Sequence, residues 1–135
     1  KPFLVAIAKL QFPAKTPKAA RSLDPLVVTG VAGAGDIVSA RYLGGNQVIF
    51  RIDHWGFPGV ESAEMTIDPA EVYSVEVGQG DSGTTLSLNG KQVLVHSLKP
   101  YATTRAQITF GSNKIGGGIT GTRFSGKILS SAVKP

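Results

Sequence analysis

Short hydrophobic runs with alternating polar positions recur along the whole chain, and turn-forming residues separate them. Alternation with a period of two is typical of β-strands that bury one face. The runs that predict strands are PFLVAIAKLQF, PLVVTGV, DIVSARYL, QVIFRID, AEMTID, EVYSVEV, TTLSLNGKQVLVHS with two strands, AQITFGS and TRFSGKILS. No stretch has the periodicity of a helix. About ten strands therefore predict an all-β fold, a two-sheet antiparallel β-sandwich.

Glycine and asparagine mark the turns between these strands. Asn89-Gly90 lies between two alternating runs, and this pair suits the positive φ angles of a two-residue type I′ turn. Gly44–Asn46 predicts a second hairpin, between DIVSARYL and QVIFRID. GVAGAGD, at 30–36, resembles a nucleotide-binding loop, but it lacks the third glycine and no helix pattern follows. It is predicted to be a tight connection between strands.

The alternation assigns two faces to the strand that leads to the only tryptophan. The inner face is predicted to carry Val48, Phe50, Ile52 and His54, and the outer face Ile49, Arg51, Asp53 and Trp55. The pairing register with the preceding strand is open. It is therefore also open whether Arg41 shares the face of Arg51.

Composition is consistent with a single globular domain over residues 1–135, excised from a longer protein, since the sequence starts at Lys1-Pro2 without a methionine. The 17 glycines and 8 prolines fit a fold with many turns. The absence of cysteine excludes disulfides, thiol catalysis and cysteine-based zinc sites. No window is long and apolar enough for a membrane span, and there is no intact secretory signal.

The net charge of +5 comes from one end of the chain. Five of the 14 basic residues precede the first acidic residue, Asp24, and the remaining nine balance the nine acidic residues. The segment FPAKTPKAARSLDP is predicted to be a solvated loop with basic character. Nucleic-acid-binding signatures are absent, and this loop does not interleave aromatic with basic residues. Nucleic acid is therefore not an expected partner.

Several motifs in order resemble the concanavalin A-like lectin/glucanase superfamily, in its laminin-G-like branch. The matching segments are LDPLVVTGVAGAGDIVSARYLGGNQVIFRIDHWG, YSVEVGQG, LSLNGKQV, ITFGSNKIGGG and RFSGKIL. The resemblance implies a jelly-roll sandwich with one concave and one convex sheet. It also implies ligand binding on the concave face or at the rim loops, often near a calcium ion. Within RFSGKIL, Gly126 is expected to allow close backbone approach, while Phe124 and Ile128 point into the core.

The carboxylates do not predict the paired acids of a glycoside hydrolase. Glu61 and Glu64 are three residues apart and face opposite ways on a strand. Glu64 and Asp68 share a face by parity, but Asp68 lies in an Asp-Pro turn. Two scattered histidines without a nucleophile-elbow motif give no basis for a serine hydrolase. A non-catalytic domain is expected, with a glycoside hydrolase as the weaker alternative.

Candidate ligand-binding residues lie at strand ends and loops. They are Arg41, Arg51, Asp53, Trp55 and Asn113. Asp36 and Asp81 are weak candidates for calcium, which prefers oxygen ligands near turns; no cofactor is otherwise expected. Trp55 is the best single lead, because an indole stacks on sugar faces. Alternatively, Trp55 packs at a corner formed by Gly56, Pro58 and Gly59.

The sequence therefore predicts a lectin-like recognition module of an extracellular or cell-envelope protein. Carbohydrate is the first candidate ligand, bound through the concave face or the rim loops. The alternative is a structural or protein-interaction domain with the same fold. The two differ in whether Trp55 stands in a groove beside Arg51 and Asp53 or is buried against Phe57 or Pro58.

Overall fold

A computed structural model describes residues 3–14, 23–117 and 120–134. Within these residues the chain forms eleven strands and one short 3-10 helix. The strands are β1 (Leu4–Gln11), β2 (Asp24–Val31), β3 (Ala34–Gly44), β4 (Gln47–His54), β5 (Val60–Glu61), β6 (Met65–Thr66), β7 (Tyr73–Gly80), β8 (Gly83–Leu88), β9 (Lys91–His96), β10 (Thr109–Phe110) and β11 (Lys127–Lys134), and the helix η1 is Arg105–Gln107. The described part contains no helix long and apolar enough to cross a membrane.

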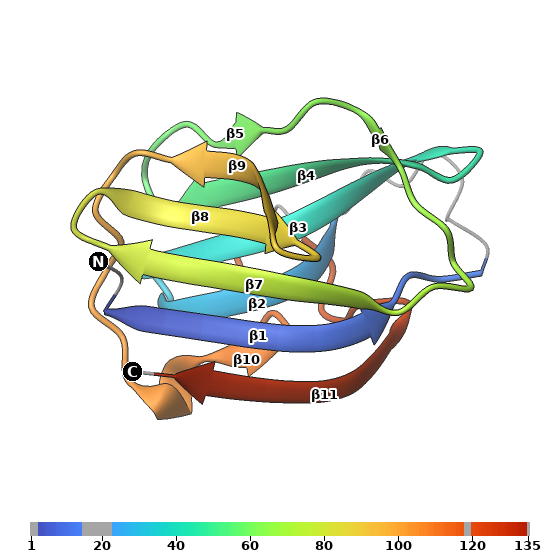
Figure 1. The fold of residues 1–135 in the computed structure, drawn as a ribbon. Helices are drawn as coiled ribbons and strands as arrows, with labels where there is room; N and C mark the ends of the chain where they lie inside the picture. The colour runs from blue at the N-terminus through green and yellow to red at the C-terminus, as the bar shows by residue number, and fades with distance from the viewer. Residues whose placement is uncertain (1–2, 15–22, 118–119, 135) are drawn as a thin grey trace.

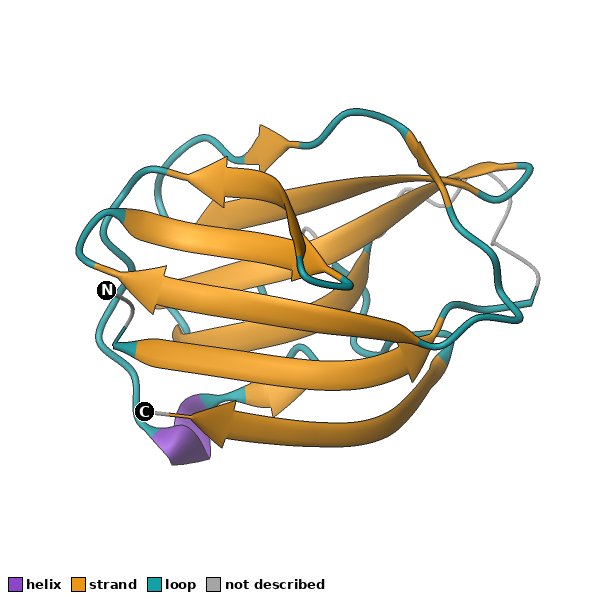
Figure 2. Ribbon diagram, in the orientation of Figure 1, coloured by secondary structure: helices purple, strands orange, loops and turns teal. Residues whose placement is uncertain are grey.

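The strands form two antiparallel sheets packed face to face (Figures 1 and 2). One sheet has five strands in the order β11-β1-β7-β8-β9. The other has six, in the order β10-β2-β3-β4-β5, with β6 also paired to β4. Each sheet also joins strands from distant parts of the sequence, β11 beside β1 in one and β10 beside β2 in the other. This arrangement confirms the predicted all-β two-sheet sandwich.

Both predicted hairpins are present, and their turns have the expected backbone. Asn89 and Gly90 have φ angles of 49° and 83° and connect β8 to β9. Gly45 and Asn46 have φ angles of 58° and 63° and connect β3 to β4. Positive φ at both central positions matches the twist of the flanking strands. The predicted tight connection in GVAGAGD is the turn between β2 and β3.

The core lies between the sheets, and an aromatic cluster joins them. Phe12, just after β1, is 2% exposed, and its ring centroid lies 5.3 Å from that of Tyr73 in β7. The same ring lies 6.0 Å from Phe50 in β4 and 6.0 Å from Phe124. Residues at the alternate positions Val48, Phe50 and Ile52 are fully buried, as predicted for the inner face of β4.

The closing RFSGKIL segment also behaves as predicted. A Cβ atom at Gly126 would collide with the backbone oxygen of Gln11 at the end of β1. Phe124 belongs to the buried core, and Ile128 packs against it. Asp24, at the start of β2, fixes this segment by accepting hydrogen bonds from Ser125 N (3.0 Å) and from the Tyr42 hydroxyl (2.8 Å).

Three predicted strands differ in their extent from their hydrophobic runs. AEMTID contributes only β6, since Met65 and Thr66 alone pair with β4. AQITFGS contributes only β10, because Arg105–Gln107 form a 3-10 turn in which the Gln107 side chain accepts a hydrogen bond from Thr104 N. In TRFSGKILS the strand begins only at Lys127, after the close approach at Gly126, and it continues beyond the run to Lys134. Most of the predicted basic loop, at 15–22, lies outside the described residues.

Candidate functional site

The outer face of the six-stranded sheet carries most of the candidate residues. Ser39 of β3 pairs directly with Arg51 of β4, and Ile37 pairs with Asp53. Directly paired residues point to the same side of a sheet. The register therefore places Arg41, two residues from Ser39, on the same face as Arg51. This answers the question that the alternation alone left open.

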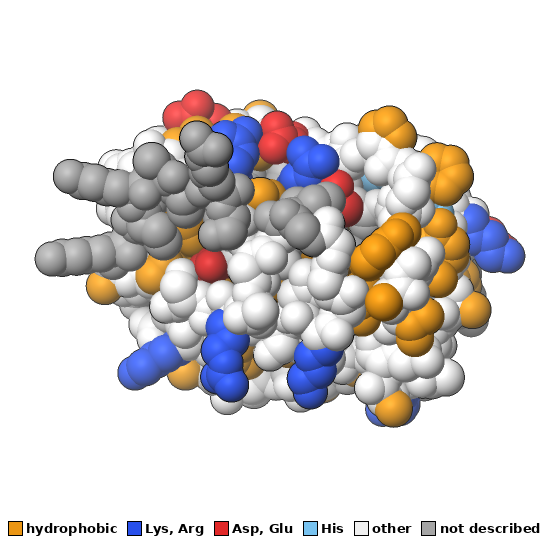
Figure 3. All heavy atoms as spheres, turned by 180° about the vertical axis from the view of Figure 1, so that it is seen from behind, with side chains coloured by type: hydrophobic (Ala, Val, Ile, Leu, Met, Phe, Trp, Pro, Cys, Tyr) orange, Lys and Arg blue, Asp and Glu red, His pale blue; other side chains and the backbone are white. Residues whose placement is uncertain are grey.

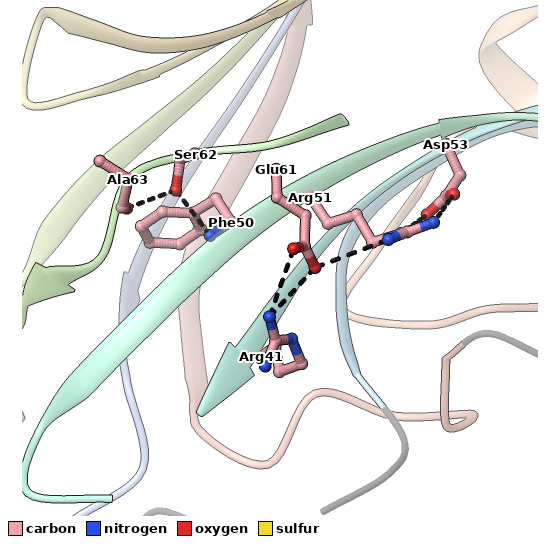
Figure 4. A network of polar contacts seen from close by, with 7 residues as sticks. All are labelled: Arg41, Phe50, Arg51, Asp53, Glu61, Ser62 and Ala63. Atoms are coloured by element: carbon pink, nitrogen blue, oxygen red, sulfur yellow. Dashed lines mark hydrogen bonds and ion pairs between the residues drawn. The ribbon is translucent and has the colours of Figure 1, made fainter. Parts of the chain in front are cut away.

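A chain of ion pairs runs along this face (Figure 4). Arg51 binds Asp53 with both ends of its guanidinium, through Nε–Oδ2 at 2.8 Å and Nη2–Oδ1 at 2.9 Å. Glu61 of β5 lies 3.5 Å from Arg51 Nη1 and 3.3 Å from Arg41 Nη2. The hydrogen bond to Asp53 raises the pKa of Arg51, so its charge is retained. The four groups neutralise one another.

The Arg51–Asp53 pair also positions the connection between β4 and β5. A Cβ atom at Gly59 would collide with Asp53 Oδ1 and would lie 2.6 Å from Arg51 Nη2, so the backbone there lies directly against the pair. Ser62 adds a second anchor, since its hydroxyl accepts a hydrogen bond from Phe50 N at 2.9 Å (Figure 4). The ion pair therefore has a structural role in addition to any contact with a ligand.

A pocket opens where β4 ends, and we call it the rim pocket. It is lined by Ile37, Asp53, Trp55, Gly56, Phe57 and Gly117, together with Gly35 and His54. Trp55 is half-buried, whereas Phe57 is 53% exposed. Hydrophobic side chains gather at this end of the face, at the right of Figure 3. The pocket thus combines aromatic surface with one carboxylate.

The backbone of Trp55 is held on two sides. Its N–H donates to Gly35 O at 3.0 Å, and its carbonyl accepts a hydrogen bond from the Tyr101 hydroxyl at 2.6 Å. Gly117 lies against the indole, because a Cβ atom there would be 3.3 Å from Trp55 Cζ3. Trp55 is thus neither fully buried nor free-standing. It shares the rim pocket with Asp53, while Arg51 lies outside the pocket lining.

His54 points the opposite way from Trp55, as the alternation predicts. It is 6% exposed, and its Nδ1 lies 2.6 Å from Asp36 Oδ1. Its ring stacks on Tyr101, with centroids 4.1 Å apart and planes 8° apart. Burial raises the pKa of Asp36, against the hydrogen bonds from His54 and Tyr101 N, which lower it. The His54–Asp36 pair thus joins the end of β4 to β3, and through Tyr101 it is also connected to the loop that holds the backbone of Trp55.

The remaining candidates are engaged elsewhere. Asn113 is 8% exposed and holds its own loop, because its side chain donates to Gly116 O and Thr120 Oγ1 and accepts from Ile115 N and Gly116 N. Both carboxylate oxygens of Asp36 are engaged: Oδ1 binds His54, and Oδ2 accepts a hydrogen bond from Tyr101 N. Asp81 is exposed and lies 3.4 Å from Lys99 Nζ. Across residues 3–14, 23–117 and 120–134, no three His, Asp or Glu side chains are grouped so as to hold a metal ion.

Three members of this site were not predicted from the sequence. Glu61 was considered only as a catalytic acid, although its pairing with two arginines depends on the β4–β5 register. The sequence indicates Phe57 only as a possible packing partner of Trp55, and it does not indicate Gly117. Gly117 is 62 positions from Trp55 in the sequence, so no local pattern could connect them. The Gly-rich composition of the 116–118 segment was the one available signal.

No protein-family model and no curated protein sequence matches this chain. Several solved structures do. A native heptameric SAP-like pentraxin from Limulus polyphemus matches with a TM-score of 0.61 at 13% identity, over 96% of this chain and 62% of that chain. The CBM40 of the Ruminococcus gnavus IT-sialidase, bound to α2,3-sialyllactose, matches with a TM-score of 0.59 at 10% identity, over 96% of this chain and 74% of that chain. Sheep galectin-11, in complex with glycerol, matches with a TM-score of 0.51 at 14% identity, over 99% and 98%.

These identities are low, so the similarity concerns the fold. The chain spans a little under two thirds of the pentraxin and nearly the whole of the galectin. The laminin-G-like branch within the superfamily stays a prediction. The resemblance predicted from the sequence is confirmed at the level of the fold: the chain forms a two-sheet β-sandwich similar to those of the pentraxin, the CBM40 and the galectin.

Proposed function

We propose that this chain is a non-catalytic recognition module that binds carbohydrate at the rim pocket. The observation that carries the proposal is the half-buried indole of Trp55 beside the Asp53 carboxylate in a pocket at the end of the sandwich. We further propose that it serves as one domain of an extracellular or cell-envelope protein. The presence of lectin-type proteins among the structural neighbours supports the proposal.

The pocket offers the two kinds of contact that a sugar ring uses. The indole of Trp55 and the exposed ring of Phe57 provide apolar surface for the C–H face of a pyranose. Asp53 lines the pocket with a side chain that is 7% exposed, and a carboxylate has about four acceptor positions, of which Arg51 uses two, so acceptor capacity remains for a ligand hydroxyl group. Arg51 orients that carboxylate, so the acceptor is fixed before a ligand arrives.

The arrangement of the acids supports binding without hydrolysis. Glu61 is engaged by Arg41 and Arg51 in ion pairs, and Asp68 accepts a hydrogen bond from Ala70 N in its turn. A glycoside hydrolase needs two carboxylates on either side of the scissile bond, one of them a proton donor. We therefore expect no turnover of any glycan that binds.

Glycan-array screening followed by calorimetry tests the proposal. Trp55 is the only tryptophan, so its fluorescence reports on this pocket alone. We expect a bound glycan to change that fluorescence.

We expect Trp55→Ala and Phe57→Ala to weaken binding at least about tenfold, which corresponds to roughly 1.4 kcal/mol. Phe3→Ala is the matched control, because Phe3 is exposed to 48%, similar to Phe57, but does not line the pocket. Binding that is unchanged in Trp55→Ala would refute the pocket assignment.

A protein-interaction module is the second candidate, and the exposure of Phe57 favours it. A large aromatic ring that is 53% exposed can mark a contact surface. The array separates the candidates. Failure of every glycan to bind, together with self-association in sedimentation that Phe57→Ser abolishes, would favour this second function.

A further inference from the structure

The core of the sandwich becomes polar at the end where β4 and β7 finish. The six-stranded sheet contributes Thr29, Asp36 and His54, which are directly paired across β2, β3 and β4. The five-stranded sheet contributes Gln79, Thr84 and His96, directly paired across β7, β8 and β9. All six are buried, with exposed fractions between 1% and 6%. We call these two facing rows the polar layer.

The row on the six-stranded sheet is satisfied by protein atoms. Asp36 binds His54 Nδ1 and Tyr101 N through its two carboxylate oxygens, at 2.6 and 2.9 Å. Thr29 Oγ1 accepts a hydrogen bond from Gln79 Nε2 at 3.0 Å. That contact is also the bridge between the rows. The rings of His54 and His96 lie at a centroid distance of 6.0 Å, with their planes tilted by 41°.

The row on the five-stranded sheet is not satisfied in this way. Gln79 Oε1, Thr84 Oγ1 and His96 Nδ1 are buried and have no hydrogen-bond partner among the protein atoms that the structure describes. Thr84 pairs with both Gln79 and His96 in the register, so the three side chains are neighbours on one face. Buried polar atoms almost always have a partner, since leaving one without a partner costs the free energy of its lost hydration.

The hydrogen-bond roles of these atoms follow from their other contacts. His96 Nε2 lies 3.0 Å from Pro58 O, and a carbonyl oxygen only accepts, so Nε2 carries the hydrogen. In the neutral imidazole, His96 Nδ1 is then an acceptor. Gln79 Oε1 is an acceptor as well, because it is a carbonyl oxygen, and the amide nitrogen of Gln79 donates to Thr29 Oγ1. Two acceptors thus flank one hydroxyl group.

A hydroxyl group has one hydrogen and cannot satisfy two acceptors. The missing partner must donate a second hydrogen and can accept one from Thr84, and a water molecule does both. A cation fits less well, because the side chains of Gln79 and Thr84 carry no negative charge and both oxygens of Asp36 are already engaged. We propose that Gln79, Thr84 and His96 bind at least one ordered water molecule inside the sandwich. None of these three residues lines the rim pocket, and the proposal does not depend on carbohydrate binding.

A high-resolution crystal structure of the chain tests this directly. We expect a density peak at about 2.6–3.2 Å from at least two of the three atoms, refined as water. The absence of any such peak near these three atoms would overturn the proposal. A peak at about 2.0–2.4 Å, typical of a bound metal cation, would overturn it too.

Water-oxygen NMR relaxation dispersion provides a second measurement in solution, where buried waters exchange slowly. We expect the Gln79→Leu, Thr84→Val double variant to lose about one long-lived water per molecule relative to the unmodified chain. Gln92→Leu with Thr85→Val is the matched control on the same sheet, since Gln92 is exposed and Thr85 points outward. An equal signal in the double variant and the unmodified chain would contradict the proposal. If the double variant does not fold, the crystal structure remains decisive.

Discussion

At the scale of single residues, Gly126 shows how one missing side chain permits the two ends of the chain to meet. It lies against the backbone of Gln11, and the ring of Phe124 is within 2.6 Å of where a Cβ atom would be. Neither obstacle can move easily, since one is backbone and the other is part of the aromatic core.

We expect Gly126→Ala to lower the free energy of unfolding by about 1–3 kcal/mol, as in other overpacked sites. Urea unfolding followed by circular dichroism measures this. Gly78→Ala is the control, because its Cβ atom would meet only the movable hydroxyl of Thr85, at 2.9 Å. We expect Gly126→Ala to lose more unfolding free energy than Gly78→Ala. The opposite order would mean that the backbones do not approach as closely as described.

Also at this scale, Trp55 owes its position to residues that the sequence keeps far apart. Tyr101 holds its carbonyl, Gly35 holds its N–H and Gly117 lies against its ring. A half-buried indole with a fixed backbone is pre-organised for a ligand, since little conformational freedom is left to lose on binding.

At the scale of elements, the hairpin between β8 and β9 depends on two residues. Asn89 and Gly90 both have positive φ, and the Asn89 side chain accepts a hydrogen bond from Ser74 N at 2.8 Å. The turn therefore also connects the hairpin to β7. This contact links local turn geometry to the order of strands in the five-stranded sheet.

We expect Gly90→Ala to destabilise the protein by roughly 1 kcal/mol, because a Cβ atom is unfavourable at a φ of 83° although there is open space around it. Gly90→Asn should cost less, since asparagine tolerates this region. Thermal unfolding of the two variants compares them. Equal losses would indicate that the turn changes type when glycine is replaced.

At the scale of the whole molecule, the two sheets share one core, and Phe12 lies at its aromatic centre. Its ring contacts Tyr73 on the five-stranded sheet and Phe50 on the six-stranded sheet. Loss of this ring therefore weakens both sheets and the packing between them.

We expect Phe12→Ala to cost about 3–5 kcal/mol of stability, and Phe12→Leu clearly less. Because the core is shared, unfolding should remain a single transition in both variants. Trp55 fluorescence follows the rim of the six-stranded sheet, and circular dichroism follows all strands. Two separate transitions would show that the sheets unfold independently.

Many features of the whole molecule can be predicted from the sequence. Strand positions, both hairpin turns and the inner and outer faces of β4 follow from local patterns, because side-chain alternation and turn geometry depend on adjacent residues. Predictions failed where a hydrophobic run was longer than the strand that its neighbour could pair. AQITFGS is an example, in which its first two residues belong to a 3-10 turn and only Thr109 and Phe110 form a strand.

The sequence by itself therefore determined the fold class, the turns and the residues able to form a site, with Arg51, Asp53 and Trp55 on one side of a strand. Only the tertiary structure decided which of these groups meet. The register joined Glu61 to Arg41 and Arg51, the 113–117 loop supplied Gly117 to the pocket, and two facing rows formed the polar layer. The physical reason is that such contacts arise between strands and loops distant in sequence, whose pairing depends on the whole sandwich being packed.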